Sequence, residues 1–300
     1  MSQLSVAPYV APYVALMKLR VVELLLVTTL PALFMATYAQ NHSHKFPTLV
    51  LTLATLVGGT LAAGAANAFN MIIEVESDRL MKRTDKRPLV NGDVTKNQAM
   101  VFALVITAIS LLIFALFTTA LATWLTLAAI AFYVFGYTIG LKRRTAQNIV
   151  WGGIAGCMPV LIGWAAVTNS LSATAWFFFL LIFFWTPPHF WALAIKYKDD
   201  YAAAGIPMLP VVASIKTVQR QMWFHTIFMV AMSLLVLHSA HMAWWTWVIT
   251  IGLALGFGVQ LVKISGGDSE RSAAKLFQWS ITYLSVYSLL LVIGVLIASK

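Results

Sequence analysis

Long runs without a single charged residue constrain this chain more than any other feature. Six of them cover most of the sequence, at 24–44, 46–73, 97–141, 145–195, 221–262 and 276–299. A membrane-spanning helix needs about 20 consecutive apolar residues, and each run is long enough for at least one. Open sheets leave backbone groups unpaired in hydrocarbon, so helices are the expected element. The sequence therefore predicts an all-α, polytopic transmembrane helical bundle.

Composition excludes the other broad classes. Hydrophobic residues make up 60% of the 300 residues and charged residues only 10%, whereas soluble domains carry about 25% charge. The single cysteine, Cys157, cannot form an internal disulfide. The net charge of +10 is explained by loops that face anionic lipid. A soluble enzyme, a disordered protein and a disulfide scaffold are excluded, and no nucleic-acid partner is expected.

The three longest runs each predict two spans joined by a turn, near 118–119, 168–170 and 238–241. Nine transmembrane helices follow. With nine, all but two of the 20 lysines and arginines lie on the side of the N-terminus, the exceptions being Lys45 and Lys300. Because cytoplasmic loops are rich in basic residues, the N-terminus is expected in the cytoplasm. Residues 1–17 form an N-terminal cytoplasmic segment in this interpretation, and 18–300 form a single transmembrane domain.

A first acidic cluster continues the second predicted helix. Asn70, Glu74 and Asp78 are spaced i, i+4, i+8, which places them along one face of an α-helix. Mg²⁺ prefers oxygen ligands and usually binds one or two carboxylates together with substrate phosphates. Basic residues follow at once, at Arg79, Lys82, Arg83, Lys86 and Arg87. The pattern fits a metal–diphosphate site; a capped, solvated helix end is the alternative.

A second cluster lies at 185–201. Pro187 and Pro188 are expected to kink or break the sixth helix, and broken helices are tolerated where they line a cavity. Asp199 and Asp200 follow near the same membrane surface as the first cluster, so the two clusters could share a Mg²⁺–diphosphate. The alternative is a kinked helix whose charged end reaches the interface. Residues 201–215 are expected to form a loop, since they are uncharged but short and rich in Gly and Pro.

These residues carry a resemblance to the UbiA superfamily of intramembrane prenyltransferases. The first cluster resembles its motif N-x-x-x-D-x-x-x-D, with Glu74 where the motif usually has Asp. The M-x-R-T-x-x-R-P that follows, from Met81 to Pro88, resembles the heme O synthase branch. Further segments agree at 18–26, 141–153, 186–195 and 200–212. The resemblance runs from about residue 14 to the C-terminus.

The resemblance implies nine helices around a central cavity open to the cytoplasmic side, with Mg²⁺ as the cofactor. It implies that Asn70, Glu74 and Asp78 hold the metal–diphosphate, joined by Asp200 and, as a weaker candidate, Asp199. A leaving diphosphate also needs cationic side chains. For this role we expect Arg83, Arg87, Lys142 and Arg143, and we expect Lys18 and Arg20 at a lid or the surface.

The activity that the resemblance implies is transfer of a farnesyl group from farnesyl diphosphate to the vinyl group of heme B. Water adds, and heme O and diphosphate are the products. His189 is the first candidate for a heme-binding residue and His225 the second. Heme B is then a substrate, the lipid bilayer is the environment, and a downstream heme A synthase or terminal oxidase assembly is the expected protein partner. The expected location is the bacterial cytoplasmic (inner) membrane, with the active site facing the cytoplasm.

Other readings of the sequence remain open. A prenyltransferase of the same fold could act on another aromatic acceptor, such as a quinone precursor. A secondary transporter is a hypothesis of a different class. Transporters place ionisable sites near the bilayer midplane and often have repeated halves, whereas the acidic residues here lie at one predicted membrane face and no clear repeat is present. A non-catalytic heme chaperone would bind heme and leave it unchanged.

Overall fold

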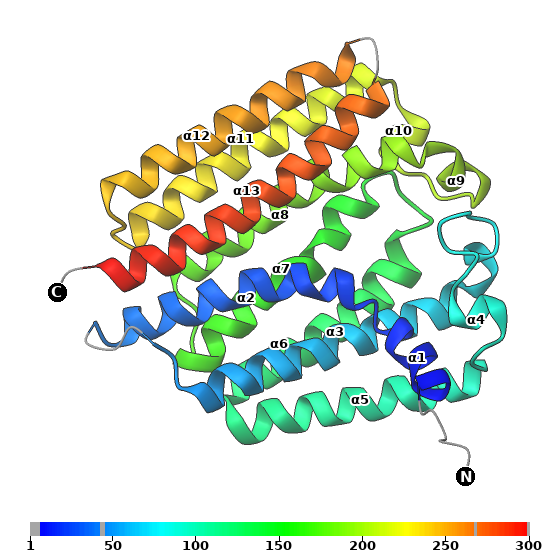
Figure 1. The fold of residues 1–300 in the computed structure, drawn as a ribbon, viewed down its shortest axis with the longest axis horizontal. Coiled ribbons are helices and arrows are strands. Elements are labelled where there is room, and N and C mark those ends of the chain that lie inside the picture. Colours follow the sequence, from blue (N-terminus) through cyan, green and yellow to red (C-terminus); the bar gives the residue numbers. More distant parts are fainter. Residues whose placement is uncertain (1–6, 43–45, 267–268, 299–300) are drawn as a thin grey trace.

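The computed structural model describes residues 7–42, 46–266 and 269–298, and in these ranges it contains helices and no strand. The long helices run side by side in one bundle, with short helices at the end where α1 and α9 lie (Figure 1). The elements are α1 Ala7–Leu16, α2 Leu19–Gln40, α3 Leu49–Asp78, α4 Pro88–Asn91, α5 Lys96–Phe117, α6 Ala120–Ala131, the π-helix η1 Phe132–Leu141, α7 Asn148–Thr168, α8 Ala173–Lys196, α9 Lys198–Ala203, α10 Leu209–Val212, α11 Ile215–Ser239, α12 Trp244–Val262, the 3₁₀ turn η2 Lys263–Ser265 and α13 Ser269–Ile297.

Within the described residues, eight helices are long and apolar enough to cross a membrane. They are α3, α5, α6 with η1, α7, α8, α11, α12 with η2, and α13. The helical membrane bundle expected from the sequence is confirmed. Helix α2 is 22 residues long and packs against α3, α7 and α13. It would be the ninth span, so the count of nine and the orientation of the N-terminus stay predictions.

The turns expected inside the three longest runs are confirmed. Helices α5 and α6 are separated by Thr118 and Thr119, α7 ends at Thr168, and α11 ends at Ser239. The first two turns are tied together, because Thr119 Oγ1 donates to Ala165 O at 2.8 Å and Leu121 N donates to Asn169 Oδ1 at 3.2 Å. These bonds satisfy polar groups at helix ends, where backbone N–H and C=O groups lack partners within the helix.

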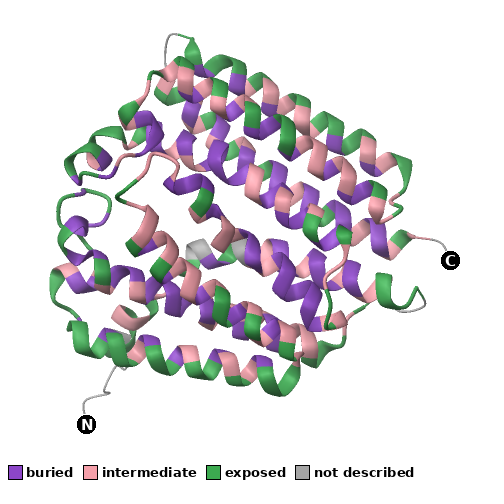
Figure 2. Ribbon diagram, turned by 180° about the vertical axis from the view of Figure 1, so that it is seen from behind, coloured by how far each residue is buried: buried purple, intermediate pink, exposed green. Residues whose placement is uncertain are grey.

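The core follows α7 and α8, whose most apolar windows are 67% and 72% buried. Exposed residues gather on the outward faces of the outermost helices (Figure 2). Helix α8 packs against α7, α11 and α13. Because α8 lies between these neighbours, its side chains reach three different helix–helix interfaces.

The break expected in α8 is wrong, and a kink at the prolines stays a prediction. The helix continues through Pro187 and Pro188 without a break, from Ala173 to Lys196. Packing explains this, because the segment is held before and after the prolines. Trp185 Nε1 donates to Ser280 O of α13 at 2.8 Å, and His189 Nδ1 lies 2.7 Å from Ser280 Oγ. Neighbouring helices let a membrane helix tolerate proline. The segment 201–215 is a loop with the short helix α10, as expected.

Candidate active site

The first acidic cluster is a buried column on α3. Asn70, Glu74 and Asp78 are 2%, 3% and 1% exposed, and they lie in the last turns of this 30-residue helix. Their position on one face, predicted from the spacing, is confirmed. The solvated helix end is excluded, since all three side chains lie inside the protein. Buried carboxylates are costly unless they are paired, so their partners identify the site.

Each member of the column is paired with a cation from a different part of the chain. Lys142 Nζ lies 2.6 Å from the Glu74 carboxylate, and the Arg87 guanidinium forms an ion pair with Asp78. Lys18 Nζ donates to Asn70 Oδ1 at 3.0 Å. The structure therefore brings two of the four cations expected at the diphosphate, Arg87 and Lys142, onto the predicted metal-binding face.

Lys18 is half-buried, and its amine contacts the column rather than projecting from the surface. It lies at the joint between α1 and α2 in a left-handed conformation (φ 51°). The connection between α1 and α2 packs against α3, where Asn67 Nδ2 donates to Met17 O at 3.0 Å and the Met17 side chain covers Gly64. Burial, aided by the charges of Arg87 and Lys142, holds the pKa of Lys18 well below its ordinary value.

Two further elements position the column. The π-helix η1 provides Thr138, whose Oγ1 accepts from Asn70 Nδ2 at 3.2 Å and donates to Tyr133 O at 2.9 Å. Such π-helical segments frequently occur at functional sites. Asn148, at the start of α7, donates through Nδ2 to the carbonyl of Lys142 at 3.3 Å and so fixes the segment after η1. Neither residue was predicted from the sequence, and Thr138 could not be, because its partner Asn70 is 68 residues away.

The donor set fits a magnesium ion bound together with substrate phosphates. Asp78 Oδ1 is buried and has no hydrogen-bond partner among the described residues, so one carboxylate oxygen is free for a ligand. Within those residues, no three His, Cys, Asp or Glu side chains gather closely enough to hold a metal alone. Mg²⁺ usually takes few protein carboxylates and keeps water and phosphate ligands, so the incomplete set is the expected one.

The loop after α3 is connected to the second cluster through aromatic residues. Arg83 Nη2 donates to Tyr201 Oη at 3.0 Å, and its guanidinium lies over the rings of Tyr197 and Tyr201, at 5.4 and 5.3 Å. Asp199 is exposed and Asp200 half-buried on α9. In the described part of the chain neither forms an ion pair, and the same holds for exposed Arg143. Metal binding by Asp199 or Asp200, and diphosphate binding by Arg143, stay predictions.

Comparison with known proteins decides the family. A sequence model described as the UbiA prenyltransferase family matches residues 25–282. The chain belongs to this family. It is 47% identical over 286 residues to the protoheme IX farnesyltransferase of Streptomyces avermitilis, covering 92% of this chain and 91% of the relative. It is 49% identical over 278 residues to that of Frankia alni, covering 91% and 94%.

Solved structures share the fold. A digeranylgeranylglyceryl phosphate synthase superposes with a TM-score of 0.77 at 15% identity, covering 95% of this chain and 98% of the other. A UbiA homolog from Archaeoglobus fulgidus, bound to DMAPP and Mg²⁺, has a TM-score of 0.68 at 15% identity, covering 93% and 98%. The chain is thus an integral membrane prenyltransferase. Its candidate active site consists of the column, the three cations paired with it, and the Arg83 bridge, by which we mean the contacts of Arg83 with Tyr197 and Tyr201.

His189 lies in the interface between α8 and α13. Its Nδ1 is 2.7 Å from Ser280 Oγ, and its ring is stacked between Trp185 at 4.2 Å and Phe277 at 4.5 Å. Both ring faces and one nitrogen of His189 are therefore occupied by the protein. Heme binding by this residue in the prenyltransferase stays a prediction.

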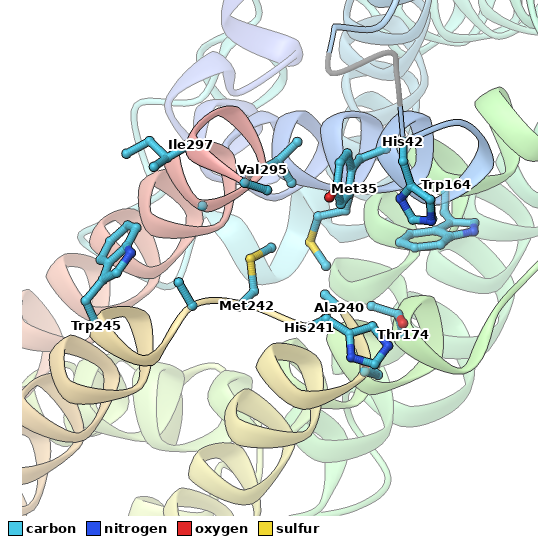
Figure 3. A pocket seen from close by; sticks show the side chains of 16 residues that line it. Met35, His42, Trp164, Thr174, Ala240, His241, Met242, Trp245, Val295 and Ile297 are labelled. Atoms are coloured by element: carbon cyan, nitrogen blue, oxygen red, sulfur yellow. The ribbon is translucent and has the colours of Figure 1, made fainter. Parts of the chain in front are cut away.

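A cavity of about 510 Å³ (Figure 3) lies at the end of the bundle opposite α4 and α9 (Figure 1). It is formed by the end of α2, the turn between α11 and α12, and the end of α13. The thioethers of Met35 and Met242 extend into it, beside Trp164 and His241. None of the site residues predicted from the sequence lines this cavity, so it is separate from the acid–cation cluster of the prenyltransferase.

Proposed function

We propose that this prenyltransferase transfers a farnesyl group from farnesyl diphosphate to a vinyl group of heme B, with addition of water, giving heme O and diphosphate. The observation that carries the proposal is the buried column Asn70–Glu74–Asp78, interleaved with Lys18, Arg87 and Lys142. The names of the relatives support heme as the acceptor. Neighbours bound to DMAPP or GPP with Mg²⁺ support a prenyl diphosphate as the donor.

Donor binding would rearrange the pairs in the column. The three cations can turn from the side-chain oxygens to the oxygens of the diphosphate, with which they form charge-assisted hydrogen bonds. The oxygens of Asn70, Glu74 and Asp78 would then be available to hold the metal, and Asp78 Oδ1 already has no partner among the described residues. Bound Mg²⁺ would neutralise charge on the leaving diphosphate. Arg83, held against Tyr197 and Tyr201, would close the loop over the donor.

The reaction breaks the bond between farnesyl C1 and the diphosphate oxygen, and the electron pair leaves with the diphosphate. The terminal vinyl carbon of heme bonds to C1, which leaves a cation on the inner vinyl carbon. Water adds there and loses a proton. The rings of Tyr133 and Tyr137, 5.4 Å apart on η1, can stabilise allylic charge through their faces and keep bulk water away.

The same proposal includes the location and the partners of the enzyme. The chain would lie in the bacterial inner membrane with nine spans, the N-terminus in the cytoplasm and the active site on that side. The basic residues on one side support this orientation. Asp199, Asp200 and Arg143 would act at the rim of the site, and a heme A synthase or an oxidase assembly would receive the product.

A product assay tests the proposed function. Purified protein in lipid would be incubated with heme B, farnesyl diphosphate and Mg²⁺, and the extracted hemes would be measured by mass spectrometry. We expect a heme heavier by a farnesyl group plus water, formed only when Mg²⁺ is present. Unchanged heme from folded protein, together with prenylation of a quinone precursor, would contradict heme as the acceptor. No prenylation of any aromatic acceptor would contradict the proposal entirely.

A further inference from the structure

A buried donor and a buried acceptor lie unpaired between α8 and α11. Trp191 is fully buried and His225 is 4% exposed. In the described part of the chain, Trp191 Nε1 and His225 Nδ1 have no hydrogen-bond partner. Their rings are neighbours, 5.5 Å apart and inclined by 75°. Buried polar atoms are nearly always paired, so two orphans on adjacent side chains need an explanation.

The two atoms have complementary chemistry. An indole N–H can only donate, and one nitrogen of a neutral imidazole accepts. A single water molecule can bind both, since a buried water needs two to four polar partners. Two further rings lie near the imidazole, Phe184 at 5.8 Å and Phe224 at 5.4 Å. These rings offer no competing strong hydrogen bond, so the two nitrogens are the polar groups available to a small molecule bound there.

Ring contacts and one backbone step connect this pair with the segment that carries Lys142. Phe184 contacts Phe183 at 5.3 Å, and Phe183 contacts Trp151 at 6.4 Å. The next residue, Gly152, lies against Tyr137, whose ring would clash with a Cβ at that position. Tyr137 O in turn accepts from the backbone N of Lys142 at 2.9 Å. Trp151 is 53% exposed, and the successive rings are inclined by 54° and 79° to one another, so the series ends in an accessible ring against which an aromatic acceptor can pack.

We propose that Trp191 and His225 bind the water molecule that adds to the farnesylated heme. The inference rests on the proposed function. The water oxygen forms a bond to the cationic inner vinyl carbon, and His225 Nδ1 takes the proton, so that the heme carries the hydroxyl group and the imidazole becomes protonated. Trp191 orients the water by donating to its oxygen. His189 cannot have this role through Nδ1, which is occupied by Ser280 Oγ.

The proposal explains how a site that must exclude water can still use one. Bulk water would capture the farnesyl cation before the heme vinyl group attacks it. A single water held by two side chains at a distance from the diphosphate reacts only with the second cation. Without the bound water, the cation on the inner vinyl carbon would lose a proton and give an olefin, whose mass is lower than that of the hydrated product by one water.

The ratio of hydrated to olefinic heme tests this role, because a structural defect changes yield and not the ratio. Protein in lipid with heme B, farnesyl diphosphate and Mg²⁺ would be sampled early and extracted without acid. For His225→Phe and Trp191→Phe, we expect the ratio to fall at least about tenfold, a low value for loss of a positioned base. His225→Asn, which keeps a hydrogen-bond acceptor near the position of Nδ1, should restore part of the ratio of hydrated to olefinic heme.

Thr226→Val is the matched control, since it removes another buried hydroxyl without a partner from the same helix. Its product ratio should equal that of the wild type. An unchanged ratio in both aromatic variants, with farnesylated heme still formed, would overturn the water site. Trp191→Phe alone decides the matter if His225→Phe does not fold. Absence of farnesylated heme in the wild type would instead contradict the proposed function, and the inference with it.

Discussion

The first acidic segment lies on α3, a helix of 30 residues, whereas the second lies on α9, a helix of six. On α3 the column is at most 3% exposed and every member has a cationic partner. On α9, Asp199 is exposed and Asp200 half-buried. Acidic residues at the same membrane surface therefore have different surroundings, set by the rigidity and burial of the element that carries them.

This difference in burial and rigidity predicts that the segment on α3 contributes more to donor binding than the segment on α9. Groups on long, packed elements are positioned more precisely than groups on loops, so the first segment should carry most of the donor binding. The second segment contacts it through Tyr197 and Tyr201, which hold Arg83. The aspartates themselves should matter less than these rings.

The largest effect is expected for Asp78→Asn. The change keeps the size of the side chain but removes the negative charge that pairs with Arg87 and carries the free Oδ1. Loss of a group that organises charge at the reacting centre costs about 10²–10³ in rate. Steady-state formation of farnesylated heme measures it. Asp199→Asn is the matched control, and equal losses in the two variants would break the ranking.

The next largest effect is expected for Lys142→Met, which retains the length of the side chain. It leaves Glu74 buried without its cation and removes a phosphate partner, so donor KM should rise by about 10–100-fold, as for other lost charge-assisted bonds. In the double variant with Glu74→Gln, the losses should not add, because the residues are paired. Additive losses would show that they act separately.

Lys18→Met should weaken donor binding about tenfold, the lower end of the range for a charged hydrogen bond. The pKa of the Lys18 amine is lowered by burial, so it loses its charge at a lower pH than an ordinary lysine. Donor affinity of the wild type should therefore fall as the pH rises into the alkaline range. A titration of affinity against pH checks this, and an equally steep fall in Lys18→Met would assign the effect to another group.

The Arg83 bridge should give a smaller effect. Tyr201→Phe removes the 3.0 Å hydrogen bond and keeps the ring under the guanidinium, so donor affinity should fall by about 3–10-fold, the size of one net hydrogen bond. In Arg83→Met the further change Tyr201→Phe should have no added effect. A remaining effect would mean that Tyr201 contacts the donor itself.

The smallest effect is expected for Asp199→Asn, less than about threefold in rate, in line with substitutions at exposed positions. The side chain is exposed and faces a small pocket of about 190 Å³ shared with Lys198 and Glu270. Asp200→Asn, on the half-buried side of α9, should have the larger effect of the two. The reverse order would assign Asp199 to the metal.

Local sequence spacing predicted the column on α3 and the turns between spans, because both depend on helical periodicity and on the length of apolar runs. It did not predict the partners of the column. Lys18 and Asn70 are 52 residues apart, Glu74 and Lys142 are 68 apart, and Arg83 and Tyr201 are 118 apart. Such contacts depend on how the helices pack. The continuous α8 was missed for the same reason, since α13 supports it across the prolines.

Binding of an unreactive donor tests the central claim most directly. Farnesyl thiolodiphosphate, in which sulfur replaces the bridging oxygen, would be titrated by calorimetry into wild type, Asp78→Asn and Asp199→Asn, each with and without Mg²⁺. If the α3 column holds the donor, the wild type and Asp199→Asn should bind with a similar, Mg²⁺-dependent Kd, and Asp78→Asn should lose that dependence. Mg²⁺-dependent binding that survives in Asp78→Asn and disappears in Asp199→Asn would contradict the claim.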